Sequence, residues 1–188
     1  MNKTNQDYLD QLSTFLTIIP QKYVDALLTL QSKLHDKNIK WVVSGDLAER
    51  LRLVKVDPDF VEVGTSKDGA EQINQAVQEF KPQKVSVQTK QLSRNAVIGG
   101  KEFPVYSRSY CFEFIVKDVT IKVEGDLQFK VGNWDWGDVF DFEPEYVYVT
   151  GKKIAVTPLA ILYELYQMLG WVDRAEKIAK IIKPHTSK

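Results

Sequence analysis

The sequence is poor in the residues on which several common functional sites depend. Of its 188 residues, one is cysteine (Cys111) and two are histidine (His35 and His185). A single cysteine excludes a disulfide within the chain. Two histidines supply little material for a histidine-based zinc site or a serine–histidine–aspartate triad. A bound metal would therefore depend on carboxylates, which favours Mg²⁺ or Mn²⁺.

The chain also lacks an excess of charge and a long apolar run. Lys and Arg together number 25, as do Asp and Glu, so the formal net charge is zero. Nothing in this balance indicates a general affinity for nucleic acid or an anionic membrane. No apolar run has the length of a bilayer span, and the polar residues 1–10 do not resemble a signal peptide. We therefore expect no membrane partner and a cytoplasmic location.

Hydrophobic periodicity predicts a protein of the α/β (α+β) class, with a small mixed sheet flanked by helices. The expected strands are residues 40–44, 59–63, 84–89, 110–116, 119–124, 146–150 and 153–156. The expected helices are residues 5–17, 20–37, 47–53, 67–80 with Ser66 as N-cap, 157–169 and 172–182. Residues 90–109 have no clear pattern and are expected to form a loop with a turn at Gly99 and Gly100.

Length and element order predict a single domain over residues 1–188. Within it, residues 1–38 would form N-terminal helices, residues 39–156 an α/β core and residues 157–184 C-terminal helices. The part of the chain that carries the chemistry is expected to be the core, because its strands hold clustered carboxylates.

Two expected strands carry or adjoin acidic residues. Residues i and i+2 of a strand share a face, and the second strand allows two such pairs. One pair is Asp57 and Asp59, separated by Pro58, and the other is Phe60 and Glu62. Strand chemistry favours the second register, because both of its members lie inside the strand.

A third acid, Glu124, lies on the strand 119–124, beside Lys122. It projects away from the apolar face that Ile121 and Val123 form. The alternative for Lys122 and Glu124 is an ordinary solvent-exposed strand surface.

The chain resembles the nucleotidyltransferase superfamily over about residues 40–182. The stretches that carry the resemblance are Ser44-Gly45-Asp46, the residues 65–70 (TSKDGA), the residues 122–126 (KVEGD) and Leu169-Gly170. The resemblance implies a nucleotidyltransferase-type fold. It also implies transfer of a nucleoside monophosphate from a nucleoside triphosphate (NTP) to a hydroxyl or protein acceptor, dependent on Mg²⁺ or Mn²⁺.

The resemblance also implies roles for particular residues. Glu62, Glu124 and Asp59 would be catalytic and would hold the metal, with Asp57 completing the set. Nucleotidyl transfer of this kind uses two divalent ions that clamp the attacking and leaving oxygens. The cofactor-binding residues would be Ser44 and Gly45, whose backbone faces the phosphates, and Lys55, which would add positive charge.

Three residues depart from the pattern of this superfamily. Asp46 stands where a small residue is usual, Phe60 stands at a ligand position of the favoured register, and Trp171 follows Gly170 where relatives often carry arginine. These departures motivate an alternative function: a catalytically lapsed domain that binds a nucleotide or a protein partner.

Two further features have plain structural interpretations. Residues 133–145 alternate aromatic and acidic side chains, and we expect the aromatic rings to pack on the core and the acids to be solvated. A lid or a stacking surface for a base or sugar is the alternative. Arg174 belongs to a basic row on the last expected helix, and this row is expected to face solvent.

Overall fold

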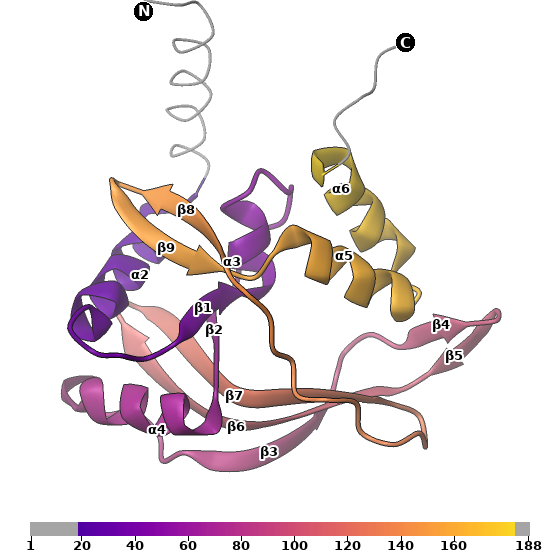
Figure 1. The fold of residues 1–188 in the computed structure, drawn as a ribbon, viewed down its shortest axis with the longest axis horizontal. Helices are drawn as coiled ribbons and strands as arrows, with labels where there is room; N and C mark the ends of the chain where they lie inside the picture. The colour runs from indigo at the N-terminus through magenta and orange to yellow at the C-terminus, as the bar shows by residue number, and fades with distance from the viewer. Residues whose placement is uncertain (1–18, 183–188) are drawn as a thin grey trace, which may run out of the picture.

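The structure is a computed structural model that describes residues 19–182 (Figure 1). The helix expected at residues 5–17 lies outside the described residues. Within residues 19–182 the α-helices are α2 (Gln21–Leu34), α3 (Gly45–Arg50), α4 (Lys67–Ala76), α5 (Leu159–Met168) and α6 (Val172–Ile182). The strands are β1 (Trp41–Ser44), β2 (Val61–Thr65), β3 (Ser86–Gln91), β4 (Ala96–Ile98), β5 (Lys101–Phe103), β6 (Val105–Val116), β7 (Val119–Val131), β8 (Glu145–Val149) and β9 (Lys152–Val156). No helix in this part of the chain combines the length and the hydrophobicity that a bilayer span requires.

Seven of the described strands form one mixed sheet in the order β3-β6-β7-β2-β1-β9-β8, and β4 pairs with β5 in a separate small hairpin. At the centre, β2 runs parallel to β7 and antiparallel to β1, and β1 runs parallel to β9. The predicted α/β class, with a mixed sheet flanked by helices, is confirmed.

The sheet separates two hydrophobic cores. Helices α2 and α4 cover one face and pack on alternate residues of β2 and β7, which include Val61, Val63, Ile121 and Val123. The second core joins α5 and α6 to the β4–β5 hairpin. Because side chains alternate along a strand, the residues between the apolar ones project from the opposite face of β2 and β7. That face therefore carries polar side chains toward the second core.

The structure corrects the expected start of the second strand. β2 begins at Val61, and its pairing with β1 runs from Ser44 opposite Glu62 to Trp41 opposite Thr65. Asp59 and Phe60 form a bend before the strand. Of the favoured register, Glu62 lies in the strand but Phe60 does not, and Asp59 of the other pair also lies before the strand.

The expected loop at residues 90–109 is also wrong. This region contains the hairpin β4–β5, with its turn at Gly99 and Gly100, and the first residues of β6. The hairpin is held from outside, since the amide of Val97 donates to the carbonyl of Leu169 at 2.9 Å. Which of its side chains are buried depends on contacts with the C-terminal helices. The local sequence therefore does not show the alternation of apolar and polar residues that marks a strand.

The N-terminus of α4 is fixed close to the end of the β2–β7 pairing. Ser66 caps the helix as predicted, because its hydroxyl accepts a hydrogen bond from the amide of Gly69 at 3.0 Å. The carboxylate of Asp126 accepts from the amide of Lys67 at 3.0 Å. Gly125 permits this approach, since a Cβ there would lie 2.7 Å from the carbonyl oxygen of Ser66. Gly125 and Asp126, which follow Glu124 on β7, are therefore held against the start of α4.

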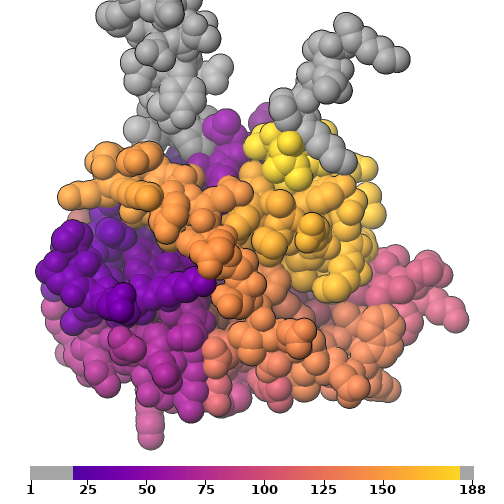
Figure 2. Space-filling view, viewed as in Figure 1, coloured from indigo at the N-terminus to yellow at the C-terminus, as the bar shows by residue number. Residues whose placement is uncertain are grey.

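The acidic and aromatic segment after β7 runs back along the edge of that strand. The amides of Gly137 and Phe140 donate to the carbonyls of Phe129 and Leu127, at 2.9 and 2.7 Å. On the surface, the segment lies between the indigo N-terminal elements and the yellow C-terminal helices (Figure 2). The packing prediction is confirmed for the half-buried Phe140 and wrong for Trp134, which is 57% exposed.

Candidate functional site

Two cavities lie on the polar face of the central strands. The first has a volume of about 390 Å³ and the second about 400 Å³, which are sizes typical of small-molecule sites. Their linings share Ser44, Glu62, Glu124, Leu127 and Phe140. The two cavities therefore meet at the two glutamates that the sequence singled out.

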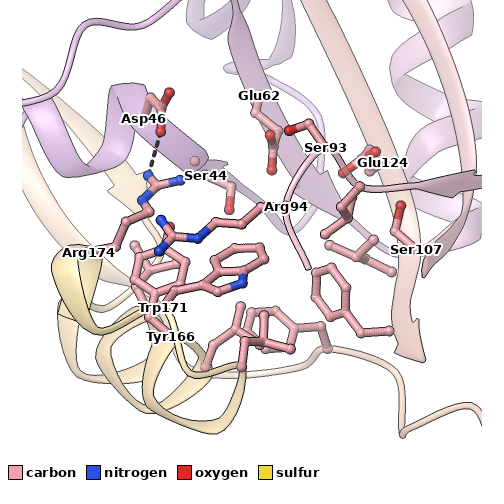
Figure 3. A pocket seen from close by; sticks show the side chains of 18 of the residues that line it. Ser44, Asp46, Glu62, Ser93, Arg94, Ser107, Glu124, Tyr166, Trp171 and Arg174 are labelled. Carbon is pink, nitrogen blue, oxygen red and sulfur yellow. Dashed lines mark hydrogen bonds and ion pairs between the residues drawn. The ribbon is translucent and has the colours of Figure 1, made fainter. Parts of the chain in front are cut away.

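The first cavity has a charged end and an apolar end (Figure 3). The charged end is formed by α3, the central strands and α6, and includes Asp46, Glu62, Lys122, Glu124 and Arg174. The apolar end is formed by α5, the residues that follow it, β7 and the residue after β3, and includes Leu92, Phe129, Leu162, Leu165, Leu169 and Trp171. Such a lining suits a ligand with an anionic part and a planar or apolar part.

Glu62, Lys122 and Glu124 form a compact group at the charged end. In the parallel pairing of β2 and β7, Glu62 lies opposite Lys122, and Gly64 lies opposite Glu124. The Nζ atom of Lys122 lies 2.5 Å from Oε1 of Glu124, whose residue is 5% exposed. The same ammonium group lies 5.7 Å from the centre of the Phe60 ring.

The charges of this group shift the pKa values of two of its members. Burial, and then the negative charge of Glu124, raise the pKa of Glu62 to about 7. Burial works against the charged form of Lys122, but Glu124 and then Glu62 outweigh it and raise the pKa of the ammonium group above its usual value. Near neutral pH, Glu62 can therefore take up or release a proton, while Lys122 remains a cation.

The lack of a side chain at Gly45 leaves room for the carboxylate of Glu62. Its φ of +59° lies in the left-handed region, and a Cβ at this position would lie 2.9 Å from Oε2 of Glu62. Ser44, directly before it, accepts a hydrogen bond from the hydroxyl of Thr157 at 3.1 Å. The turn after β1 thus leaves the backbone of Gly45 open to the cavity.

Arg174 of α6 reaches across to α3 and neutralises the acidic residue that departs from the family pattern. Its Nη2 atom donates to Oδ1 of Asp46 at 2.5 Å (Figure 3). The same atom also donates to Oε1 of Glu49. Glu49 is 1% exposed and accepts a further hydrogen bond from the hydroxyl of Tyr166 at 2.6 Å. The expectation that Arg174 faces solvent is therefore wrong, because its side chain reaches two carboxylates of α3.

Trp171 follows Gly170, where relatives often carry arginine, and the side chain of a different arginine, Arg94, lies against its ring. The Arg94 guanidinium carbon lies 5.4 Å from the centre of the Trp171 ring, and its Nη1 atom lies 3.1 Å from Oδ2 of Asp173. The indole nitrogen of Trp171 donates to the carbonyl of Asn95 at 2.7 Å. Figure 3 shows Arg94 extending across the cavity above Trp171.

The structure brings most of the predicted site residues together. Ser44, Gly45, Asp59, Glu62 and Glu124 all line the first cavity. Asp57 and Lys55 line neither cavity. The side chain of Asp57 is 98% exposed and lies 3.9 Å from Arg50, and Lys55 is exposed.

The three basic residues that line the first cavity were not predicted as part of the site. Lys122 could have been found, because it precedes Glu124 by two residues and shares its strand face. Arg94 belongs to a region without a readable pattern, and the position of Arg174 depends on how α6 packs.

The residues present do not fit a pair of divalent metal ions. Glu124 is already paired with Lys122, a phenyl ring stands at position 60, and Asp57 is turned to solvent. Within residues 19–182, no group of three or more His, Cys, Asp or Glu side chains is arranged to hold a metal ion. Mg²⁺ requires near-octahedral oxygen coordination, which this arrangement does not offer.

Comparison with known proteins gives one informative structural match. No family model matches the chain, and no curated protein matches it significantly. A Thermotoga maritima protein provisionally named a nucleotidyltransferase is 25% identical in sequence. The match has a TM-score of 0.63 and covers 89% of this chain and 97% of that one. The chain therefore has a nucleotidyltransferase-like fold, as the resemblance in its sequence implied.

Two structures of the antibiotic-resistance factor ANT(2″)-Ia are more distant. One, in complex with adenylyl-2″-tobramycin, is 7% identical to this chain, with a TM-score of 0.48. The match covers 85% of this chain and 88% of the other chain. The other is 8% identical to this chain, with a TM-score of 0.47, and the match covers 85% of this chain and 83% of the other chain.

Proposed function

We propose that this protein binds an NTP in the first cavity and transfers its nucleoside monophosphate to an acceptor hydroxyl in the second. The observation that carries the proposal is that two cavities of similar size meet at Glu62 and Glu124. A module that only binds a nucleotide needs one cavity, whereas group transfer needs two that share the reacting point. The nucleotidyltransferase-like fold supports the same class of reaction.

The two ends of the first cavity suggest how the nucleotide is oriented. The open backbone at Gly45 and the cations Lys122 and Arg174 favour the phosphates at the charged end. The side chains of Leu165, Leu169 and Trp171 offer a surface on which a base can pack.

The second cavity would hold the acceptor. Its lining combines the aromatic rings of Trp41 and Phe142 with the carboxylates of Asp126 and Asp141. This mixture favours an acceptor that carries hydroxyl groups, a partly apolar surface and positive rather than negative charge.

In the reaction, the acceptor hydroxyl oxygen would attack the α-phosphorus of the NTP. A new oxygen–phosphorus bond forms, the bond to the β-phosphate oxygen breaks, and pyrophosphate leaves. The proton of the hydroxyl passes to the carboxylate of Glu62, whose pKa of about 7 suits a general base near neutral pH. The phosphates would share the cations of this cavity, Lys122, Arg174 and Arg94, with the carboxylates that already pair with them.

A catalytically lapsed nucleotide-binding protein is the second candidate. Phe60 and the Lys122–Glu124 ion pair favour it, because they stand where the superfamily pattern places metal ligands and metal. The two candidates differ in whether bound NTP releases pyrophosphate when an acceptor is present.

The first test is a calorimetric titration of the purified protein with ATP, GTP, CTP and UTP, each with and without Mg²⁺. Two variants separate the cavities, since Ser93 lines only the first and the exposed Val139 lines only the second. Ser93→Trp should abolish NTP binding, whereas Val139→Trp should leave it intact and lower pyrophosphate release with an acceptor. If none of the four NTPs binds to the folded wild-type protein, the proposed function is wrong.

A further inference from the structure

We infer that the ammonium group of Lys122 takes the place of a divalent cation between Glu62 and Glu124, so that this site binds its nucleotide without Mg²⁺. The nucleotide part of this inference rests on the proposed function. The statement about the cation does not, because it concerns the protein alone.

The position of Lys122 is the first reason. It lies on the same strand face as Glu124 and directly opposite Glu62 on the parallel strand β2. Its ammonium group is within 2.5 Å of Glu124, and its side chain is only 18% exposed. A cation enclosed in this way already neutralises the carboxylate that a metal would need.

The ring of Phe60 is the second reason. Phe60 lines the first cavity beside Glu62 and lies 5.7 Å from the ammonium group of Lys122. Mg²⁺ gives up its water reluctantly and usually retains several water ligands. A phenyl ring supplies no oxygen and occupies the space of these waters, whereas an ammonium group is attracted to its face.

The charges around the cavity are the third reason. Of the charged side chains that line the cavity, four are acidic (Asp46, Asp59, Glu62 and Glu124) and three are basic (Arg94, Lys122 and Arg174). Arg94 is paired with Asp173. Arg174 is committed to Asp46 and Glu49. Lys122 is therefore the cation that balances the two glutamates, and a divalent ion would have to displace it.

The protein's own affinity for metal tests this inference without any nucleotide. Mn²⁺ is titrated into the protein, and free Mn²⁺ is followed by electron paramagnetic resonance. The wild-type protein should show no saturable site. Lys122→Gln should release Glu124 and strengthen Mn²⁺ binding at least about tenfold, and Lys122→Gln with Phe60→Asp should strengthen it further.

Lys130→Gln is the matched control. Lys130 lies on the same strand, but its ammonium group packs over the rings of Tyr106 and Trp136, and the residue lines neither cavity. This variant should bind no more Mn²⁺ than the wild-type protein.

The outcomes separate the inference from the proposed function. A saturable Mn²⁺ site in the wild-type protein that disappears in Glu124→Gln would overturn the inference, even if Lys122→Gln does not fold. A folded Lys122→Gln without added Mn²⁺ affinity would also overturn it. An NTP affinity that is the same within about twofold in EDTA and in Mg²⁺ supports it, whereas failure of every NTP to bind rejects only the proposed function.

Discussion

Two charged clusters, each with two carboxylates and one cation, lie on either side of the Gly45 turn, and they differ in their hydrogen bonds and in their access to the two cavities. In the first, which comprises Asp46, Glu49, Tyr166 and Arg174, the buried carboxylate of Glu49 receives hydrogen bonds from both the phenol and the guanidinium group. In the second, which comprises Glu62, Lys122 and Glu124, one ammonium group also faces two carboxylates, but both glutamates line the two cavities.

The difference shows which cluster holds the structure and which is available for chemistry. A buried charge with good hydrogen bonds fixes the elements that carry it, here α3, α5 and α6. Burial raises the pKa of both Glu49 and Glu62. Glu49 lines neither cavity, whereas Glu62 lines both, and its pKa of about 7 serves proton transfer. We therefore expect changes in the first cluster to affect mainly stability, and changes in the second to affect mainly binding and turnover.

The largest effect is expected for Glu62→Gln, which keeps the shape of the side chain and removes the base. Pyrophosphate release should fall by about 10²- to 10⁴-fold, the usual contribution of general base catalysis. The melting temperature at pH 8 should not fall, because the variant removes a carboxylate that Glu124 repels. An unchanged rate would show that Glu62 is not the base.

The next effect is expected for Glu49→Ala, in the first cluster. This change leaves the hydroxyl of Tyr166 and one contact of Arg174 without their buried partner. Breaking a buried pair in this way should lower the free energy of unfolding by about 3 kcal/mol, as measured by urea denaturation.

The exposed Glu164 on α5 supplies the control for this change. Glu164→Ala should alter the free energy of unfolding by less than about 0.5 kcal/mol. Equal losses in the two variants would contradict a structural role of the first cluster.

A smaller effect is expected for Gly45→Ala, at the turn between the clusters. A residue other than glycine at a φ of +59° costs about 1–2 kcal/mol, and its Cβ would also crowd the carboxylate of Glu62. Gly151→Ala is a matched control, because Gly151 has a φ of +78° and open space around the added Cβ. Both variants should lose stability, but only Gly45→Ala should also lose NTP affinity. Equal NTP affinity in both would show that the space beside Glu62 is not needed for binding.

The sequence predicted the parts of this comparison that depend on local pattern. The alternation of β2 and β7 placed Glu62 and Glu124 on one polar face, and the break at Gly45 located the turn. The first cluster was not predictable in the same way. Glu49 and Tyr166 are 117 positions apart and look like ordinary members of their helices. Only the tertiary fold, which brings Tyr166 of α5 to Glu49 of α3, joins them.

Asp46 shows why a departure from a family pattern is hard to interpret from sequence. Alone, it predicts repulsion of a triphosphate. In the structure, Arg174 neutralises it from a helix that follows more than 120 residues later. The partner of a charged residue depends on tertiary contacts, and no spacing rule within one segment predicts it.

The smallest expected effect is a pH dependence of stability that belongs to the second cluster. The pKa of Glu62 is about 7 in the folded protein, against an ordinary value of 4.5. Between these two values the folded protein binds a proton that the unfolded chain has released. The free energy of unfolding should therefore fall as the pH rises from about 4.5 to about 7, and this contribution should level off above that range.

Urea denaturation across this pH range, in the wild-type protein and in Glu62→Gln, isolates that contribution. The groups that act on Glu62 are Glu124 and Lys122 of β7, Asp46 of α3 and Arg174 of α6, and all of them are present in both proteins. The difference in free energy of unfolding, wild type minus variant, should decrease with rising pH, whereas the difference between wild type and Glu164→Gln should stay flat. A flat difference for Glu62→Gln as well would mean that the pKa of Glu62 is not raised in the folded protein, and the second cluster would then lack the group that suits proton transfer near neutral pH.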